Sequence, residues 1–243
     1  MKTAVVIPAR YASTRFPGKP LAKINGKEMI LWTIEGVLKS KSVENVVVAT
    51  DHDAIFDLVN SSPLATAVMT DSELPTGTDR VYQAIKGLDV DVVINVQGDE
   101  PLFDGRCLDP LLKAFDVDHI QMATMGRKFK AFDEIESQTT AKIVLNKNNE
   151  ALYFSRFALP FSREKMDLDT SVKHIGIYAY RKSFLKEFCQ SEPSSIEMAE
   201  GLEQLRALYL GAKIKVVMVE SDSWGVDTPE DILKIENILA QRG

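Results

Sequence analysis

Three positively charged side chains lie close together near the start of the chain. Arg10, Arg15 and Lys19 fall within ten residues, and no acidic residue separates them. Arginine offers forked hydrogen-bond donors and lysine offers a compact charge, and both suit phosphate groups. The small residues at 12–14 would let backbone N–H groups approach an anion closely. This segment therefore predicts a cradle for a polyphosphate, and an ordinary solvated basic loop is the alternative.

Acidic residues that could hold a metal ion lie in two distant places. Asp99 follows the apolar run at 92–96, and Asp227 lies just before the pattern of the last helix. Mg²⁺ bound to a nucleotide takes few carboxylates, because phosphate and water oxygens supply its other ligands. Two aspartates from separate elements would therefore be enough. The alternatives are a helix-capping role for Asp227 and a turn position for Asp99.

Further polar side chains in the second half could bind a ligand that carries a carboxylate and hydroxyl groups. Arg156 follows an apolar run, and His174 and Tyr178 share one face of a predicted strand. Glu203 and Gln204 fall within a helical pattern. These residue types supply the donors and acceptors that such a ligand needs. The alternatives are a sheet edge with a structural histidine, and a solvated helix face.

Short β-branched runs alternate with helical patterns over the first hundred residues, which predicts a parallel sheet with crossover helices. In such a sheet, binding residues collect at the carboxyl ends of the strands. The cationic segment and Asp99 both follow predicted strands, so we expect them to meet at one edge. The predicted strands cover residues 4–7, 46–49 and 92–96, and helical spacing is found at 30–38 and 81–85.

The second half predicts further strands and helices, and no linker rich in Gly, Pro or Ser interrupts it. Its strands are expected at 151–155, 175–180 and 213–219, and its helices at 184–189, at 196–210 and from Pro229 onward. Proline suits the first turn of a helix, and the acidic residues that follow it favour the helix dipole. The fold class is therefore predicted as α/β, with one domain over residues 1–243 and a mixed, mostly parallel sheet.

Composition and charge exclude several classes of protein. The 243 residues are 45% hydrophobic and 26% charged, with a net charge of -6, so a binding surface for a nucleic acid polymer is not expected. No apolar run has the length of a membrane span, and the N-terminal run at 4–7 is too short for a secretory signal. Two cysteines are too few for a disulfide framework. We therefore expect a cytoplasmic protein without membrane insertion.

The amino-acid sequence of the cationic segment resembles the signature motif of sugar nucleotidyltransferases. It is most similar to the 3-deoxy-manno-octulosonate (Kdo) cytidylyltransferase family, the CMP-Kdo synthetases, because residues 7–21 read IPARYASTRFPGKPL. The resemblance continues in the family's order over the full chain. It is carried by VATD at 48–51, GTDR at 77–80, NVQGDEP at 95–101, ALYFSR at 151–156, HIGIYAY at 174–180, LEQLR at 202–206 and VDTPED at 226–231.

The resemblance implies a fold, a reaction and a cofactor. The fold would be the nucleotide-diphospho-sugar transferase-like (Rossmann-like, GT-A type) three-layer fold, with a nucleotide-binding half at 1–115 and a sugar-binding and dimerisation half at 116–243. The reaction would transfer CMP from CTP to Kdo, an acidic eight-carbon sugar, with Mg²⁺ as cofactor, in lipopolysaccharide biosynthesis. The resemblance also implies a homodimer.

Roles for individual residues follow from the same resemblance. Catalysis would depend on Arg10, Lys19 and Asp99. CTP would contact Pro8, Ala9, Arg10, Ser13, Lys19, Thr76, Gly77 and Thr78. The sugar would contact Arg15, Gln97, Arg156, His174, Tyr178, Glu203 and Gln204. Mg²⁺ would bind Asp99 and Asp227.

Three alternatives stay open. The substrate could be the 8-amino-3,8-dideoxy version of the sugar acid, since the chain departs from the family's commonest pattern at 160–162 and at Ala179. A sialic acid cytidylyltransferase or a hexose-1-phosphate enzyme would carry a different first loop and would lack the motif at 174–178. A non-catalytic nucleotide-binding module would be expected to have lost the lysine of the cradle or one of the two aspartates.

Overall fold

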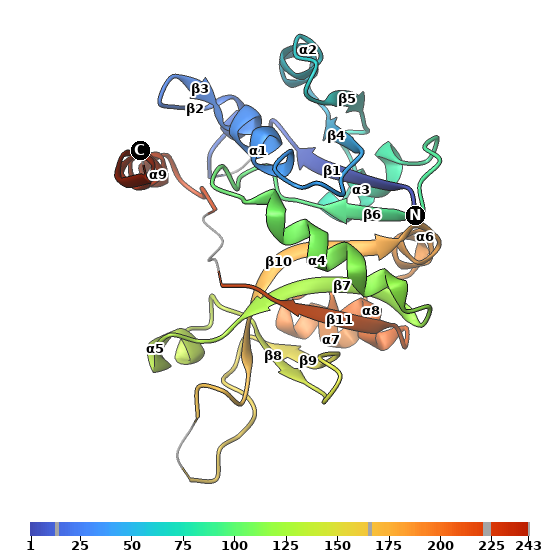
Figure 1. Cartoon of the computed structure of the whole chain (residues 1–243), viewed down its shortest axis with the longest axis vertical. Helices are drawn as coiled ribbons and strands as arrows, with labels where there is room; N and C mark the ends of the chain where they lie inside the picture. The colour runs from blue at the N-terminus through green and yellow to red at the C-terminus, as the bar shows by residue number, and fades with distance from the viewer. Residues whose placement is uncertain (13–14, 165–166, 221–224, 243) are drawn as a thin grey trace. The chain divides into compact units, whose positions relative to one another are not determined.

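The computed structural model describes residues 1–12, 15–164, 167–220 and 225–242 of the chain (Figure 1). Contacts within it divide the chain into two compact units. The first unit contains Met1–Asp109 and Ser223–Gly243, and the second contains Pro110–Asp222. The functional halves predicted at 1–115 and 116–243 stay a prediction.

Four strands of the first unit pair in parallel, in the order β6-β1-β4-β5. They are β1 (Thr3–Ala9), β4 (Asn45–Thr50), β5 (Thr66–Met69) and β6 (Val92–Asn95). The apolar run at 4–7 lies in β1 and is fully buried, as expected for a parallel strand that is covered on both faces. The predicted parallel arrangement is confirmed, and β5 is a strand that the sequence pattern did not predict.

Short helices connect these strands, and two of them begin at a side-chain cap. They are α1 (Met29–Val37), α2 (Asp53–Asn60) and α3 (Gly77–Ala84). His52 Nδ1 accepts the N–H of Ala54 at the start of α2, and Thr76 caps α3. The smaller elements are η1 (Lys19–Leu21), β2 (Lys23–Ile24), β3 (Lys27–Glu28) and η2 (Gly105–Cys107). The chain passes from the first unit to the second within α4 (Leu108–Lys113).

The last helix, α9 (Pro229–Arg242), belongs to the first unit although it lies at the far end of the sequence. Its residue Ile235 joins a buried cluster with Ile24, Met29 and Val226. Burial of these side chains ties the C-terminal segment to the region that follows the cationic loop. As a result, Val226 and Asp227 lie close to residues from the first hundred.

The second unit is built around β7 (Ile120–Arg127). This strand pairs antiparallel with β10 (Val172–Arg181) and parallel with β11 (Lys213–Met218). A further pair, β8 (Lys142–Leu145) and β9 (Ala151–Ser155), is antiparallel and joins the start of β10 through β8. The predicted strands are confirmed in β9, β10 and β11, and the predicted α/β class with mixed, mostly parallel strand pairing is confirmed. Strands β7 and β8 were not predicted.

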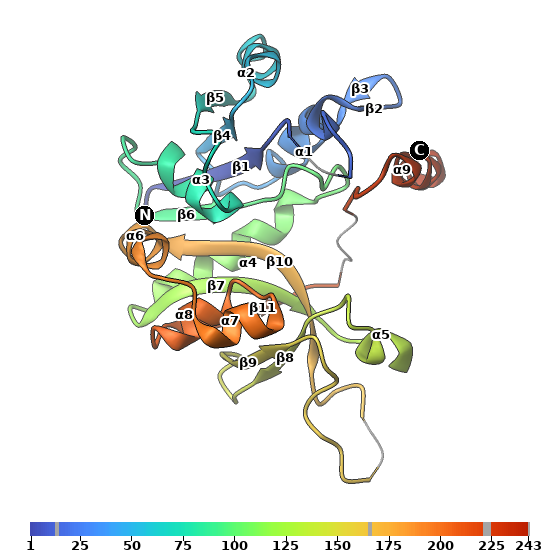
Figure 2. The same cartoon turned by 180° about the vertical axis from the view of Figure 1, so that it is seen from behind.

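The helix predicted at 196–210 is wrong, because two helices occupy this stretch (Figure 2). Helix α7 (Ser195–Glu200) ends at Gly201, whose φ of 60° is left-handed, and α8 (Leu205–Tyr209) follows after a turn. The other helical elements of the unit are η3 (Ala114–Asp116), α5 (Phe132–Glu136) and α6 (Lys182–Gln190). Each helix in the described part of the chain is too short or too polar to cross a membrane.

An ion pair in the second unit makes its stability depend on pH. Arg127 is almost fully buried, with 2% of its side chain exposed, and its guanidinium donates to the carboxylate of Glu134. These hydrogen bonds lower the pKa of Glu134 from 4.5 to about 2. A carboxyl group with a lowered folded-state pKa stabilises the fold above its unfolded pKa, and that contribution is lost as the pH falls through the folded value.

We therefore expect Glu134→Gln to lower the free energy of unfolding by about 1–3 kcal/mol at pH 7, and this difference to shrink as the pH is lowered from about 5 towards 3. Urea denaturation of both proteins over this pH range measures the effect. Glu136→Gln, which changes an exposed residue of the same helix, is the matched control. A difference that stays constant over the whole range would contradict the prediction.

Candidate active site

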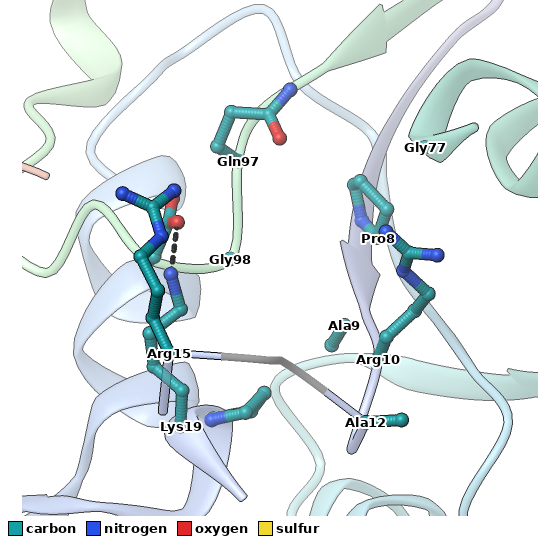
Figure 3. A pocket seen from close by; sticks show the side chains of 11 residues that line it. Pro8, Ala9, Arg10, Ala12, Arg15, Lys19, Gly77, Gln97 and Gly98 are labelled. Atoms are coloured by element: carbon teal, nitrogen blue, oxygen red, sulfur yellow. Dashed lines mark hydrogen bonds and ion pairs between the residues drawn. The ribbon is translucent and has the colours of Figure 1, made fainter. Parts of the chain in front are cut away.

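A cavity of about 440 Å³ opens beside the cationic segment of the first unit (Figure 3). Its lining comes from three places in the sequence: the end of β1 with the segment that follows it, the start of α3 and the loop after β6. The lining residues are Pro8, Ala9, Arg10, Ala12, Arg15, Lys19, Pro20, Gly77, Gln97, Gly98 and Asp99. The expectation that the cationic segment and Asp99 meet at one edge of the parallel strands is confirmed.

Lys19 is held on two sides within this cavity. Its Nζ lies 2.5 Å from Asp99 Oδ2 and donates a hydrogen bond to Val226 O at 2.9 Å. Only 16% of the side chain is exposed. Gly18 turns the chain into η1 with a φ of 70°, a left-handed conformation that favours glycine. The turn therefore fixes where Lys19 begins, and the ion pair with Asp99 fixes where its charge lies.

The two predicted metal ligands lie on segments that a backbone hydrogen bond joins. Val226 N donates to Asp99 O at 2.9 Å, and Asp227 is the next residue along the chain. The Asp227 carboxylate lies 3.3 Å from an Nη atom of Arg15. One carboxylate thus faces Lys19 and the other faces Arg15, so positive and negative charges alternate along this side of the site.

Asp231, in the first turn of α9, binds the residues that precede the helix. Asp231 Oδ2 accepts the backbone N–H groups of Asp227 and Thr228, each at 3.0 Å. The pKa of Asp231 lies well below its ordinary value, because Lys234 and these backbone groups donate to its carboxylate. These contacts do not support the helix-capping alternative for Asp227, because its carboxylate lies against Arg15.

At the start of α3, Gly77 lines the cavity, and Thr78 is buried. Thr76 Oγ1 accepts the N–H of Asp79 and donates to the Asp79 carboxylate at 2.8 Å, so the hydroxyl proton is used within the cap. A hydrogen bond that Thr76 donates to a ligand would therefore come from its backbone N–H.

The loop after β6 approaches the end of β1 so closely that only glycine fits. A Cβ atom on Gly98 would lie 2.9 Å from Pro8 O, a separation that real Cβ atoms essentially never show. Gln97, the preceding residue, lines the cavity, and its Nε2 donates to Asn95 Oδ1 at 3.3 Å. Close contact between the two loops gives the cavity one continuous wall.

The remaining predicted site residues of the cationic segment are Arg10, Ser13 and Arg15. Arg10 is exposed and lines the cavity next to Pro8, as Figure 3 shows. Arg15 lines it on the other side, next to Lys19. Ser13 lies outside the described residues. The roles assigned to these residues stay predictions.

Asp51 and Arg80, for which no site role was predicted, form a buried ion pair behind the cationic segment. An Nη atom of Arg80 lies 2.9 Å from Asp51 Oδ2, and the two side chains are 0% and 8% exposed. The other Asp51 oxygen accepts the N–H of Tyr11 at 3.1 Å, and Tyr11 O in turn accepts the N–H of Gly18. The pair therefore anchors the loop that carries the cations. A signal was present, because these residues end two of the motifs quoted above.

Asp51→Ala is expected to lower the free energy of unfolding by about 3–5 kcal/mol, because it leaves the buried Arg80 charge without its carboxylate. Urea denaturation at pH 7 measures this loss. Asp53→Ala removes an exposed carboxylate two residues further on and is expected to cost less than about 1 kcal/mol. Equal losses of unfolding free energy in the two variants would show that the buried ion pair stabilises the fold no more than an exposed carboxylate does.

The second unit holds a separate polar cluster built on β10. The ring centroids of His174 and Tyr178 lie 5.4 Å apart, which confirms that these residues share a face of the strand. The Tyr178 hydroxyl donates to Gln204 Oε1 at 3.2 Å. Burial lowers the pKa of His174 to about 3 and raises the pKa of Tyr178, so both side chains are neutral near pH 7.

Gln204 is buried, with 3% of its surface exposed, so the alternative of a solvated helix face is wrong for this residue. Its Nε2 is buried and has no hydrogen-bond partner among the described residues. Buried amide donors are rarely left unpaired, and an unpaired one at a polar cluster indicates a ligand position. Arg156 lies nearby in the unit, and its Nε donates to Glu200 O at 3.0 Å.

Parallel strands that carry a cationic cradle and a carboxylate at their carboxyl ends define an α/β protein that binds nucleotide phosphates. A family model described as "Cytidylyltransferase" matches residues 4–214 of the chain. The chain belongs to the cytidylyltransferase family, and within it to the 3-deoxy-manno-octulosonate cytidylyltransferases that the sequence motifs indicate.

Full-length relatives support this membership. The chain is 51% identical to the 3-deoxy-manno-octulosonate cytidylyltransferase of Bdellovibrio bacteriovorus, over 100% of both chains. It is 44% identical to the 8-amino-3,8-dideoxy-manno-octulosonate cytidylyltransferase of Shewanella baltica (strain OS185), over 99% of both. A solved CMP:2-keto-3-deoxy-manno-octonic acid synthetase complexed with CTP is 38% identical over 100% of both chains, with a TM-score of 0.94. The predicted fold is confirmed.

Proposed function

We propose that this chain transfers CMP from CTP to 3-deoxy-D-manno-octulosonate, giving CMP-Kdo and diphosphate for lipopolysaccharide biosynthesis. The observation that carries the proposal is the position of Lys19, whose ammonium group lies between Asp99 and Val226 at a cavity lined by the cationic loop. Support comes from the relative that is 51% identical over its full length and from the likeness to a synthetase solved with CTP.

CTP would bind in the cavity of the first unit. Arg10 and Lys19 would hold the triphosphate, since both line the cavity and both carry the charge that phosphate requires. The backbone of Pro8, Ala9 and Gly77 would surround the cytidine. Ser13, Thr76 and Thr78 complete the proposed CTP contacts.

The reaction would be a direct displacement at phosphorus. The anomeric hydroxyl of the sugar would attack the α-phosphorus, so that a new oxygen–phosphorus bond forms and the bond to the bridging oxygen of the diphosphate breaks. The hydroxyl proton passes to solvent water, and diphosphate leaves with the bonding electron pair. Arg10 and Lys19 would stabilise the charge that builds on the leaving group and would hold the triphosphate in position for attack.

The residues at the cavity fit a magnesium ion. Asp99 and Asp227 would hold it, because their segments are joined by the hydrogen bond from Val226 and both offer the oxygen ligands that Mg²⁺ prefers. No cluster of three or more His, Cys, Asp or Glu side chains suited to a metal occurs within the described residues, so phosphate and water oxygens would complete the ligand set. When bound, the ion would neutralise phosphate charge and lower the pKa of the attacking hydroxyl.

The sugar would be recognised by uncharged polar groups, by one carboxyl group and by cations. In the second unit, His174, Tyr178, Glu203 and Gln204 would bind its hydroxyl groups, and Arg156 would supply positive charge. In the first unit, Arg15 and Gln97 would contact it from the cavity wall, since both residues line the cavity.

A diphosphate-release assay tests this proposal. The purified protein is mixed with CTP, Mg²⁺ and one of three acids: Kdo, its 8-amino-3,8-dideoxy analogue or N-acetylneuraminate. Diphosphate release with Kdo, and little release with ATP or UTP in place of CTP, is the expected result. Faster turnover of the amino sugar would favour the alternative substrate, which a relative at 44% identity carries in its name. Release with N-acetylneuraminate alone would contradict the proposal.

A homodimer in the cytoplasm completes the proposed function. Several large apolar side chains of the second unit are exposed, and their burial against a partner would be favourable. They include Leu152, Phe157, Met198 and Phe161, of which Phe161 is 90% exposed. Light scattering on the eluted protein is expected to give twice the chain mass of 27.1 kDa. A mass equal to one chain at micromolar concentration would argue against the dimer.

A further inference from the structure

Thr124 is a fully buried residue of β7 whose hydroxyl group faces three groups of β10. Its Oγ1 lies 2.8 Å from Ile177 O, 3.2 Å from Ile175 O and 3.1 Å from His174 Nε2. The pairing of β10 with β7 shifts register between Ile175 and Tyr178. A side-chain hydroxyl therefore meets backbone carbonyl groups at this bulge.

The direction of these hydrogen bonds follows from counting protons. A threonine hydroxyl has one proton to donate, and both carbonyl oxygens can only accept. If the proton pointed to His174, the oxygen lone pairs of Thr124 would face those of Ile175 and Ile177 in a buried place, which is costly. The proton therefore points to the carbonyl groups, chiefly to Ile177 O. His174 Nε2 must then carry a proton and donate it to Thr124.

A neutral imidazole carries one proton, so a protonated Nε2 leaves Nδ1 with a lone pair. Burial keeps the His174 ring neutral, because it lowers the pKa to about 3. We infer that Thr124 sets His174 in the Nε2-protonated tautomer and that Nδ1 thereby accepts a hydrogen bond from a hydroxyl group of the sugar. Thr124 is in this sense a positioning residue that acts through His174.

The neighbouring Gln204 complements this acceptor. The Tyr178 hydroxyl donates to Gln204 Oε1, which fixes the orientation of the amide and leaves Nε2 as an unpaired buried donor among the described residues. The cluster thus offers one acceptor at His174 and one donor at Gln204. A sugar hydroxyl, which both donates and accepts, suits this pair, whereas a carboxylate cannot donate to Nδ1. The assignment of the sugar as the ligand rests on the proposed function, whereas the tautomer of His174 does not depend on it.

The tautomer is measured by NMR on the whole protein labelled with ¹⁵N-histidine, in the absence of substrates. The chain has three histidines, and comparison with the His174→Gln variant identifies the signals of His174. We expect a protonated Nε2 and an unprotonated Nδ1 at pH 7. A protonated Nδ1, or a ring with both nitrogens protonated, would overturn the inference.

Two variants of Thr124 form a matched pair. Thr124→Val keeps the shape of the side chain and removes the hydroxyl, whereas Thr124→Ser keeps the hydroxyl. In the valine variant we expect mixed tautomers and a KM for the sugar that rises about tenfold, because only the fraction with a free Nδ1 lone pair binds. The KM for CTP should stay unchanged. In the serine variant the tautomer and the KM for the sugar should stay as in the unmodified protein.

A merely structural role would lower the stability of the variants without moving the histidine signals. If Thr124→Val keeps the pure Nε2-protonated form and the original KM for the sugar, the inference is wrong. Failure of the proposed function gives a different result. If His174 shows the predicted tautomer but CTP and Kdo give no diphosphate, the tautomer is confirmed and the sugar is excluded as the ligand. Turnover of Kdo by a protein with protonated Nδ1 would uphold the function and exclude the inference.

Discussion

Asp99→Asn is expected to reduce kcat for CMP transfer by a factor of about 10² to 10³, equivalent to about 2.7–4 kcal/mol of transition-state stabilisation. The amide keeps the shape of the carboxylate and removes its charge. That charge faces Lys19 Nζ at 2.5 Å, and it is one of the two carboxylates proposed to hold Mg²⁺. The change therefore disturbs both the ion and the lysine that would stabilise the leaving diphosphate.

Steady-state kinetics with saturating CTP and Mg²⁺ measure this effect. Asp89→Asn is the matched control, because it changes a carboxylate of the first unit that is 88% exposed and forms a surface pair with Lys2. Surface pairs of this kind contribute little, so kcat of the control should be unchanged. Near-normal turnover of Asp99→Asn under the same conditions would remove Asp99 from the site.

Lys19→Met is expected to lower kcat/KM for CTP by a factor of about 10² to 10³, because an apolar chain of similar length replaces the ammonium group at the triphosphate. Lys19→Arg should not restore activity, since the planar guanidinium is larger than the space between Asp99 and Val226, where the lysine head lies 2.5 Å from one oxygen and 2.9 Å from the other. The same kinetics, with CTP varied, measure both variants.

Lys23→Met serves as the control for this series. Lys23 lies four residues beyond Lys19, and its side chain is 63% exposed and pairs with Glu28 at the surface.

The double variant Lys19→Met/Asp99→Asn tests whether the two residues act together. Because the two groups act on one another, the double variant should lose less than the product of the single losses. Strictly multiplicative losses would show that the two residues act independently.

The edge of the parallel strands in the first unit could be predicted from the sequence. Each strand is a short apolar run, and the residues that follow such runs meet because parallel strands end on the same side. This local rule placed the cationic loop, Gln97 and Asp99 together. The rule does not apply to Asp227, because that residue follows no strand of this kind. Asp227 was assigned to the site only through the family resemblance.

The positions that sequence patterns missed depend on contacts between distant segments. Asp51 and Arg80 each end a motif, but nothing in their spacing pairs them; they form a buried pair because β4 and α3 pack together. Helical spacing continued through 196–210, although Gly201 ends the helix, since apolar residues before and after the break happen to keep the same period. The helical pattern left a solvated face open as the alternative for Gln204, which is in fact buried.

The amino-acid sequence by itself determined the α/β class, the cationic loop and the membership of the cytidylyltransferase family, because these rest on local periodicity and on contiguous motifs. Only the tertiary structure decided that Lys19 meets Asp99 and Val226, that Arg15 meets Asp227, and that Thr124 faces His174. Those contacts join residues far apart in the chain. These contacts are determined by the burial of side chains in a common core and by the need to pair each buried polar group. The spacing of residues along the chain predicts neither.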